Sequence, residues 1–182
     1  LRLADMPAPT MGDDDVLVEI HAAAVNLLDS KIKTGEFKLI LPYRPPFILG
    51  HDIAGKVVRV GSKVRSFKSG DEVYARPRDH SIGAFAEFIA VNEADLALKP
   101  KNLSMEEAAS IPLVGLTAWQ ALVEKASLKK GQKVFIQAGS GGGFRLWRTA
   151  VTAARLEETV ARYLGPERTR AAFAEFFALR GQ

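Results

Sequence analysis

The first 100 residues of this chain consist of short stretches of strand-like sequence, separated by turn signals about every 8–12 residues. In the clearest stretch, VLVEIHAA, the apolar residues alternate and would share one face of a strand: Val16, Val18, Ile20 and Ala22. Similar patterns follow at IAGKVVRVG, EVYA, GAFAEFIAV and LALKP. This succession predicts a closed or partly closed β-structure over about residues 1–100.

The pattern becomes helical after Leu103. Ser104, with Glu107 three residues later, has the sequence of a capping box, and the spacing of apolar residues in GLTAWQALVEKASL is that of a helix. Gly131 then interrupts the helix, and KVFIQAG is typical of a buried strand that runs into a glycine-rich turn.

The last forty residues differ in composition from the rest. Residues 143–182 contain seven Arg, eight Ala and no Lys. They predict a helical hairpin with helices at about 145–164 and 167–179, broken at Gly165-Pro166. The apolar stripe of the second helix must be buried somewhere, so we expect a homo-oligomer formed through this tail.

Composition excludes several classes of protein. The net charge is +4, but the basic residues are scattered, which favours a solvated surface over a nucleic-acid interface. No apolar run reaches the roughly 20 residues that span a bilayer, so no membrane segment is predicted. The chain has no cysteine, which removes disulfides and thiolate metal ligands and suits a cytoplasmic location.

Five segments, taken in order, carry a family resemblance: AAAVNLLDSKIKTG, PPFILGHDIAGKVVRVGSKVRSFKSGDEVYA, GAFAEFIAV, MEEAASIPLVGLTAWQAL and KKGQKVFIQAGSGG. Together they closely resemble the medium-chain dehydrogenase/reductase family, and within it the zinc-free, NADPH-dependent quinone oxidoreductase (zeta-crystallin-like) branch. The resemblance implies a GroES-like β-barrel domain over residues 1–110 and the start of a truncated Rossmann nucleotide-binding domain over 111–142. Residues 143–182 are predicted to form a helical tail, which no part of the resemblance covers.

The resemblance also implies a metal-free site. Where zinc enzymes of the family have a cysteine this chain has Asn26, and where they have GHE it has Gly50-His51-Asp52. A catalytic zinc needs about three protein ligands. Only His51 and the Asp52 carboxylate remain, so we expect no metal, and His51 is interpreted as a hydrogen-bonded histidine that lines the substrate site.

Three residues are candidates for the chemistry. The Asn26 amide would hydrogen-bond a substrate carbonyl or the cofactor ribose, although an Asn here also suits the cap of a short helix ending at Thr34-Gly35. Tyr43 would orient or protonate the carbonyl, with a partly exposed loop aromatic as the equal alternative. By resemblance alone, Thr117 would approach the nicotinamide; the alternative is an ordinary capping residue at the start of a helix. His21 and His80 are interpreted as bystanders.

The glycine-rich turn departs from the family's dinucleotide-binding motif. Gly139, Ser140, Gly141 and Gly142 resemble the cradle for a dinucleotide pyrophosphate, whereas the third glycine of the motif is replaced by Phe144. No strand pattern reappears after this turn, so the nucleotide domain is incomplete.

The sequence therefore predicts an NADPH-dependent oxidoreductase that reduces quinones or α,β-unsaturated carbonyls by metal-free hydride transfer, with the isolated chain impaired. The alternative is a non-catalytic GroES-like remnant or chimera that acts by binding or self-association.

Overall fold

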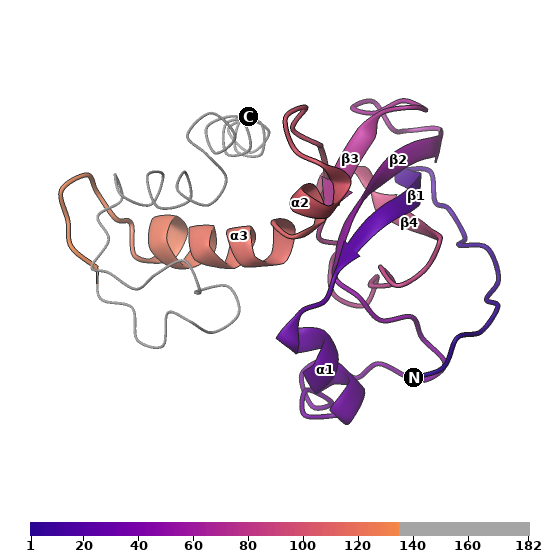
Figure 1. Cartoon of the computed structure of the whole chain (residues 1–182), viewed down its shortest axis with the longest axis horizontal. Coiled ribbons are helices and arrows are strands. Elements are labelled where there is room, and N and C mark those ends of the chain that lie inside the picture. Colours follow the sequence, from indigo (N-terminus) through magenta and orange to yellow (C-terminus); the bar gives the residue numbers. More distant parts are fainter. Residues whose placement is uncertain (135–182) are drawn as a thin grey trace.

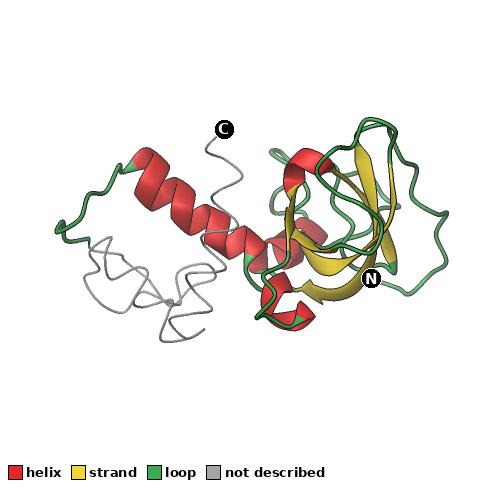
Figure 2. Cartoon of the chain, turned by 90° about the horizontal axis from the view of Figure 1, so that it is seen from above, coloured by secondary structure: helices red, strands yellow, loops and turns green. Residues whose placement is uncertain are grey.

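A computed structural model describes residues 1–134 of the chain. Five strands form one antiparallel sheet in the order β4-β1-β2-β3-β5, which curves around the core (Figure 2). Their bounds are β1 (Asp15–Ala24), β2 (Asp52–Val60), β3 (Glu72–Ala75), β4 (Phe88–Asn92) and β5 (Leu96–Leu98). The helices are α1 (Leu27–Thr34), α2 (Met105–Ala109) and α3 (Pro112–Trp119), with a 3-10 turn at Glu93–Asp95 and a π-helical turn at Gln120–Lys125.

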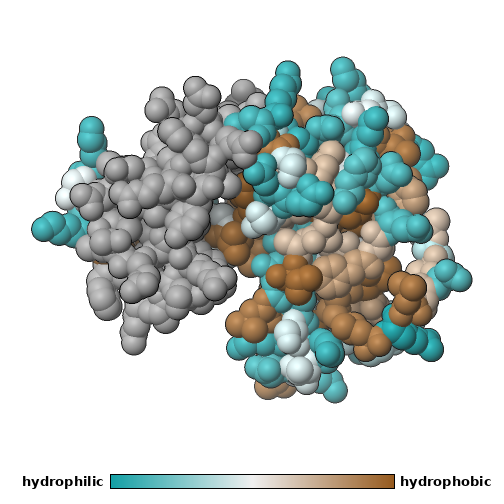
Figure 3. Space-filling view, in the orientation of Figure 1, coloured by the Kyte–Doolittle hydropathy of each residue, from teal (hydrophilic) through white to brown (hydrophobic). Residues whose placement is uncertain are grey.

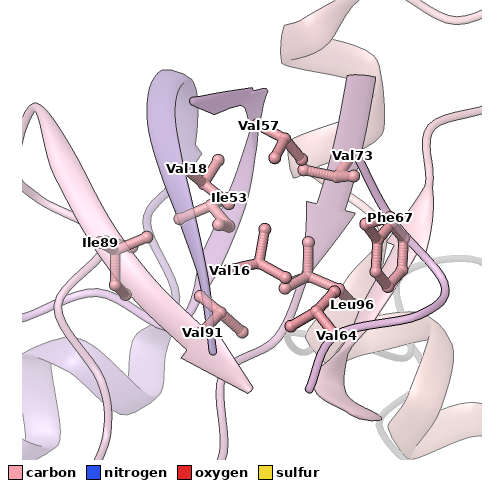
Figure 4. Close-up of a cluster of buried hydrophobic side chains, with 12 residues drawn as sticks. Val16, Val18, Ile53, Val57, Val64, Phe67, Val73, Ile89, Val91 and Leu96 are labelled. Carbon is pink, nitrogen blue, oxygen red and sulfur yellow. The ribbon is translucent and has the colours of Figure 1, made fainter. Parts of the chain in front are cut away.

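The alternating pattern of β1 places its apolar side chains on the core face, as predicted. Val16 and Val18 are fully buried, whereas Leu17 between them is half-buried and Glu19, the next residue, is exposed. They pack with Ile53, Val73 and other buried side chains drawn from all five strands (Figure 4). Burying each such side chain contributes roughly 1.5–3 kcal/mol, so this cluster is the main source of the domain's stability.

The predicted strand GAFAEFIAV is shortened at its start, because its first residues bond to a loop instead. Gly83 and Ala84 donate their N–H groups to the Gly50 carbonyl at 3.1 and 3.2 Å. Gly50 has φ +106°, and a Cβ there would lie 2.7 Å from Ala84 Cβ. Only glycine combines this positive φ with the absence of a Cβ. The close approach of Ala84 thus fixes the backbone immediately before His51.

The exit from the sheet towards the helices is tied down by one buried lysine. Lys99 Nζ donates to the carbonyls of Leu103 and Pro100 at 2.6 and 3.2 Å, and lies 3.1 Å from Glu72 Oε2. The predicted capping box of α2 is confirmed: Ser104 N–H donates to Glu107, and Glu107 N–H donates to Ser104 Oγ.

Helices α2 and α3 lie in different positions relative to the sheet. Helix α2 covers a second buried cluster on the sheet, whereas α3 runs outward from it (Figure 1). The described sheet has β4 and β5 at its edges, so full barrel closure stays a prediction. The strand expected from Lys133 lies almost wholly beyond residue 134, as do the glycine turn and the helical hairpin. Among the described helices, none has the length and apolar character needed to cross a membrane.

Candidate active site

The end of β1 and the start of β2 bring the candidate polar residues together. Ala24 pairs with Asp52 at the last step of the β1–β2 ladder. Asn26 follows β1 after one residue, Val25, and His51 immediately precedes Asp52. Asn26 and Asp52, 26 positions apart in sequence, therefore meet at one end of the sheet, where α1 also begins.

Asn26 occupies the N-cap position of α1, with extended backbone angles of −108° and 155°. Its N–H donates to Asp29 Oδ2 at 2.7 Å, which is the reciprocal bond of a capping box. The helix ends at Thr34 with Gly35 in the left-handed region at φ +83°, as predicted. The capping alternative is thus correct for the position of Asn26, but the side-chain amide makes a further contact.

That contact joins Asn26 to Asp52. Asn26 Nδ2 donates to Asp52 Oδ2 at 2.9 Å, and the N–H of Leu113 in α3 donates to Asp52 Oδ1 at 2.9 Å. Asp52 is fully buried, and burial raises the pKa of its carboxyl to about 6, although both hydrogen bonds act in the opposite direction. The carboxylate therefore links the sheet to α3.

His51 is held by a second buried carboxylate. Its Nδ1 lies 2.6 Å from Asp29 Oδ1, and the two side chains are 0% and 3% exposed. An ionised carboxylate only accepts, so Nδ1 carries the proton in this pair. Nε2 is buried without a hydrogen-bond partner among the described residues. The prediction of a hydrogen-bonded histidine is confirmed; its place beside a substrate stays a prediction.

Tyr43 lies outside this network, in the loop before β2. Its hydroxyl accepts the His80 N–H at 3.2 Å, and its ring stacks on Phe47 with centroids 5.2 Å apart. Partial burial raises the pKa of the phenol, so its proton is retained at neutral pH. His80, which we interpreted as a bystander, holds Tyr43 through its backbone and a ring contact of 5.6 Å.

Thr117 lies within α3 and not at its start. The helix begins at Pro112, so the capping alternative for Thr117 is wrong. Its exposed Oγ1 donates to the Leu113 carbonyl at 2.8 Å. Leu113 thus donates its N–H to Asp52 and accepts from Thr117 with its carbonyl, so both backbone polar groups of this residue connect the two side chains.

The structure adds two participants that sequence reasoning missed, Asp29 and the backbone of Leu113. Asp29 had a visible signal, an acid three residues after an N-cap Asn. Leu113 had none, because a backbone donor has no side-chain signature. Gly139, Ser140, Gly141 and Gly142 lie outside the described residues, so their role as a phosphate cradle is untested.

The donor set does not resemble a metal centre. Asp29 bonds His51 Nδ1 and the Asn26 N–H, and Asp52 already accepts two hydrogen bonds, so His51 Nε2 is left as a single ring nitrogen without a partner among the described residues. Within residues 1–134, no three His, Cys, Asp or Glu side chains are grouped so that they could hold a metal ion. The expected absence of zinc remains a prediction.

Comparison with known proteins identifies the fold. Residues 12–101 match the alcohol dehydrogenase GroES-like domain. The chain is 41% identical over 145 residues to a 2-methylene-furan-3-one reductase of Solanum lycopersicum, covering 76% of this chain and 37% of that protein. It is 39% identical to an NADPH-dependent alkenal/one oxidoreductase, chloroplastic, of Arabidopsis thaliana, with the same coverages of 76% and 37%.

The fold likeness extends to a solved structure. The quinone oxidoreductase from Coxiella burnetii superposes with a TM-score of 0.68 at 34% identity, over 80% of this chain and 46% of that one. The chain thus spans less than half the length of each of these proteins. The matched domain, the relatives and the superposition together show that this chain belongs to the medium-chain dehydrogenase/reductase family, in its quinone oxidoreductase branch.

Proposed function

We propose that this chain supplies the substrate-binding half of an NADPH-dependent reductase of quinones or α,β-unsaturated carbonyls. The observation that carries the proposal is the Asn26 amide, which Asp52 holds at 2.9 Å; the sequence resemblance implies that this amide takes the position of a metal ligand in the zinc enzymes of the family. With it we propose the domain division that the resemblance implies: residues 1–110 as the substrate domain, 111–142 as the start of the nucleotide domain, and 143–182 as a tail.

The proposed roles follow from the hydrogen bonds already made. Asn26 Nδ2 uses one hydrogen on Asp52 and keeps a second, which can donate to a carbonyl oxygen of the substrate. Tyr43 accepts from His80 and keeps its own O–H, which can donate a proton or a hydrogen bond to the same kind of oxygen. Both groups would polarise the carbonyl without a metal.

The described residues fit one end of the cofactor. The half-buried Asn26 amide and the exposed Thr117 hydroxyl are hydrogen-bonding groups suited to a ribose or a nicotinamide carboxamide. NADPH, when bound, would supply the hydride. The pyrophosphate cradle proposed at residues 139–142 lies beyond the described part of the chain.

A titration with duroquinone tests the substrate half directly. We expect saturable shifts of the Asn26 side-chain amide and of the Tyr43 region in NMR spectra of the whole chain. Asn26→Ala should weaken binding by about tenfold, the equivalent of one hydrogen bond to a polar ligand. The matched control is Asn102→Ala in an exposed turn, which should bind as the wild type does. Quinone binding that is equal in both variants would contradict the role of Asn26.

The absence of a metal is part of the same proposal. Elemental analysis of the purified chain should find far less than one zinc per molecule, because the ligand count required for zinc is not met. About one zinc per chain, retained through dialysis against a chelator, would overturn it.

Self-association and location are the remaining proposals. Large apolar side chains are exposed around α1, including Val25, Leu27, Leu39 and Ile40, and Figure 3 shows apolar side chains reaching the surface of the described region. Such surface supports a homo-oligomer, which light scattering would detect.

A cytoplasmic location is also proposed for this chain; the Arabidopsis relative is named as chloroplastic.

A further inference from the structure

Helix α3 lacks a cap of its own. Ile111 occupies the N-cap position and makes no side-chain hydrogen bond to the helix, and Pro112 follows at its first position. The N–H groups of a first helical turn have no partners within the helix and need an acceptor from elsewhere. Leu113 finds that acceptor 61 residues away, in Asp52 Oδ1 at 2.9 Å.

The other oxygen of the same carboxylate fixes Asn26. Because an ionised carboxylate has no hydrogen to donate, it must be Nδ2 and not Oδ1 of Asn26 that faces Asp52 Oδ2, at 2.9 Å. This bond determines which polar atoms of the amide are left for a ligand. One buried side chain thus controls both the rotation of the Asn26 amide and the start of α3.

We propose that Asp52 is a positioning residue that holds the substrate side of the site, Asn26, in register with the cofactor side, α3 and its Thr117. This inference rests on the proposed function, since it assigns those two sides. Thr117 follows Leu113 by one helical turn and bonds its carbonyl at 2.8 Å, so a shift at the start of α3 would move Thr117 as well.

The variant Asp52→Asn separates the two bonds while preserving shape. Asparagine has one acceptor oxygen, so it cannot accept from both Asn26 and Leu113. If its oxygen keeps the Leu113 N–H, its NH2 group faces Asn26, which must rotate to accept with Oδ1 and so turns a different atom to the ligand. Asp52→Ala removes both acceptors. Asp95→Asn is the matched control, because Asp95 bonds Arg78 Nε on the surface at 2.7 Å, away from the site.

The first measurement needs no ligand. Hydrogen exchange of the Leu113 amide in the whole chain should become at least about tenfold faster in Asp52→Ala, the factor expected for the loss of about 1.4 kcal/mol of protection. It should be unchanged in Asp95→Asn. The same rate at Leu113 in wild type and Asp52→Ala would overturn the proposal, whatever the chain binds.

The second measurement is a double-mutant cycle on duroquinone affinity. Asp52→Asn should weaken binding about five- to tenfold in the wild-type background and have almost no effect in Asn26→Ala, because its action passes through that amide. Equal, additive losses in both backgrounds would show a merely structural role and overturn the proposal. If wild type binds no quinone while exchange at Leu113 responds, the positioning role is supported and the proposed substrate class is refuted.

Discussion

Asp29 Oδ1 lies 2.6 Å from His51 Nδ1, and both side chains are buried at the point where α1 meets β2. Asp29 also accepts the Asn26 N–H at 2.7 Å. One carboxylate thus satisfies two donors, one of which has no access to water. Its partners come from both sides of the loop that separates β1 from β2, so the pair stabilises the whole end of the sheet.

Replacement of Asp29 by Ala should therefore lower the free energy of unfolding by about 3 kcal/mol, since two buried or part-buried donors lose their acceptor. Urea denaturation followed by circular dichroism measures this loss. Asp95→Ala, which breaks the pair with Arg78, is the control and should cost much less, as surface ion pairs do. Equal losses of unfolding free energy in the two variants would mean that the Asp29–His51 contact contributes no more to stability than a surface ion pair.

Asp52 gives the stability a distinct dependence on pH. Its pKa is raised from 3.8 to about 6, mainly by burial, so between these values the folded chain holds a proton that the unfolded chain has lost. The free energy of unfolding should therefore fall as pH rises from about 4 to about 6, by up to about 3 kcal/mol, and then level off.

The comparison with Asp52→Asn isolates this effect, because the variant has no titrating group at this position. Contributions from other carboxyls, such as Glu93 with its lowered pKa, are common to both proteins and cancel in the difference. Unfolding free energies at four pH values between 4 and 7.5 are sufficient. Parallel pH profiles for wild type and variant would contradict the raised pKa.

Gly50 and Gly70 provide a matched pair for the backbone before His51. Both have positive φ, at +106° and +93°, but a Cβ at Gly70 meets nothing within 4 Å, whereas at Gly50 it meets Ala84 and Phe85. Gly70→Ala should cost about 1 kcal/mol for its backbone conformation alone. Gly50→Ala should cost about 1–3 kcal/mol more, because the neighbouring loop must move. Thermal denaturation of both variants would reveal equal costs if the close approach were unimportant.

The 182-residue chain should not oxidise NADPH in the presence of a quinone, because Phe144 replaces the third glycine of the phosphate-binding turn. Fluorescence of Trp119 and Trp147 during an NADPH titration measures binding. We expect Phe144→Gly to tighten whatever weak binding is present. Saturable binding at low micromolar concentration by the unaltered chain, with quinone-dependent oxidation, would refute this expectation.

Local sequence patterns predicted most of the sheet and the helix boundaries. Alternation predicted the buried face of β1, and Asn26 and Gly35 marked the two ends of α1, because strand faces and helix caps depend on neighbouring residues. The start of GAFAEFIAV was predicted wrongly as strand, since Gly83 and Ala84 bond to the distant Gly50 carbonyl. Such long-range competition leaves no mark in a local pattern.

The sequence predicted several residues of the site but not the hydrogen bonds that join them. Asn26, His51 and Asp52 were visible as a motif, yet the bond from Leu113 to Asp52 spans 61 residues and uses a backbone donor. The contact of Tyr43 with His80 spans 37 residues and depends on a loop backbone with φ +69° at His80. Both contacts depend on how distant parts of the chain are brought together by the fold, which a local sequence pattern does not show.

Lys99 has a consequence for how such a domain can be reused. Its ammonium group gathers the Leu103 and Pro100 carbonyls and the Glu72 carboxylate, all from the sheet or the turn that leaves it. Bonds made within residues 72–103 therefore hold the segment through which the chain leaves the sheet. For protein design, this makes the end of the turn at Leu103 a natural point at which to join a different following segment, because the Lys99 contacts would be retained.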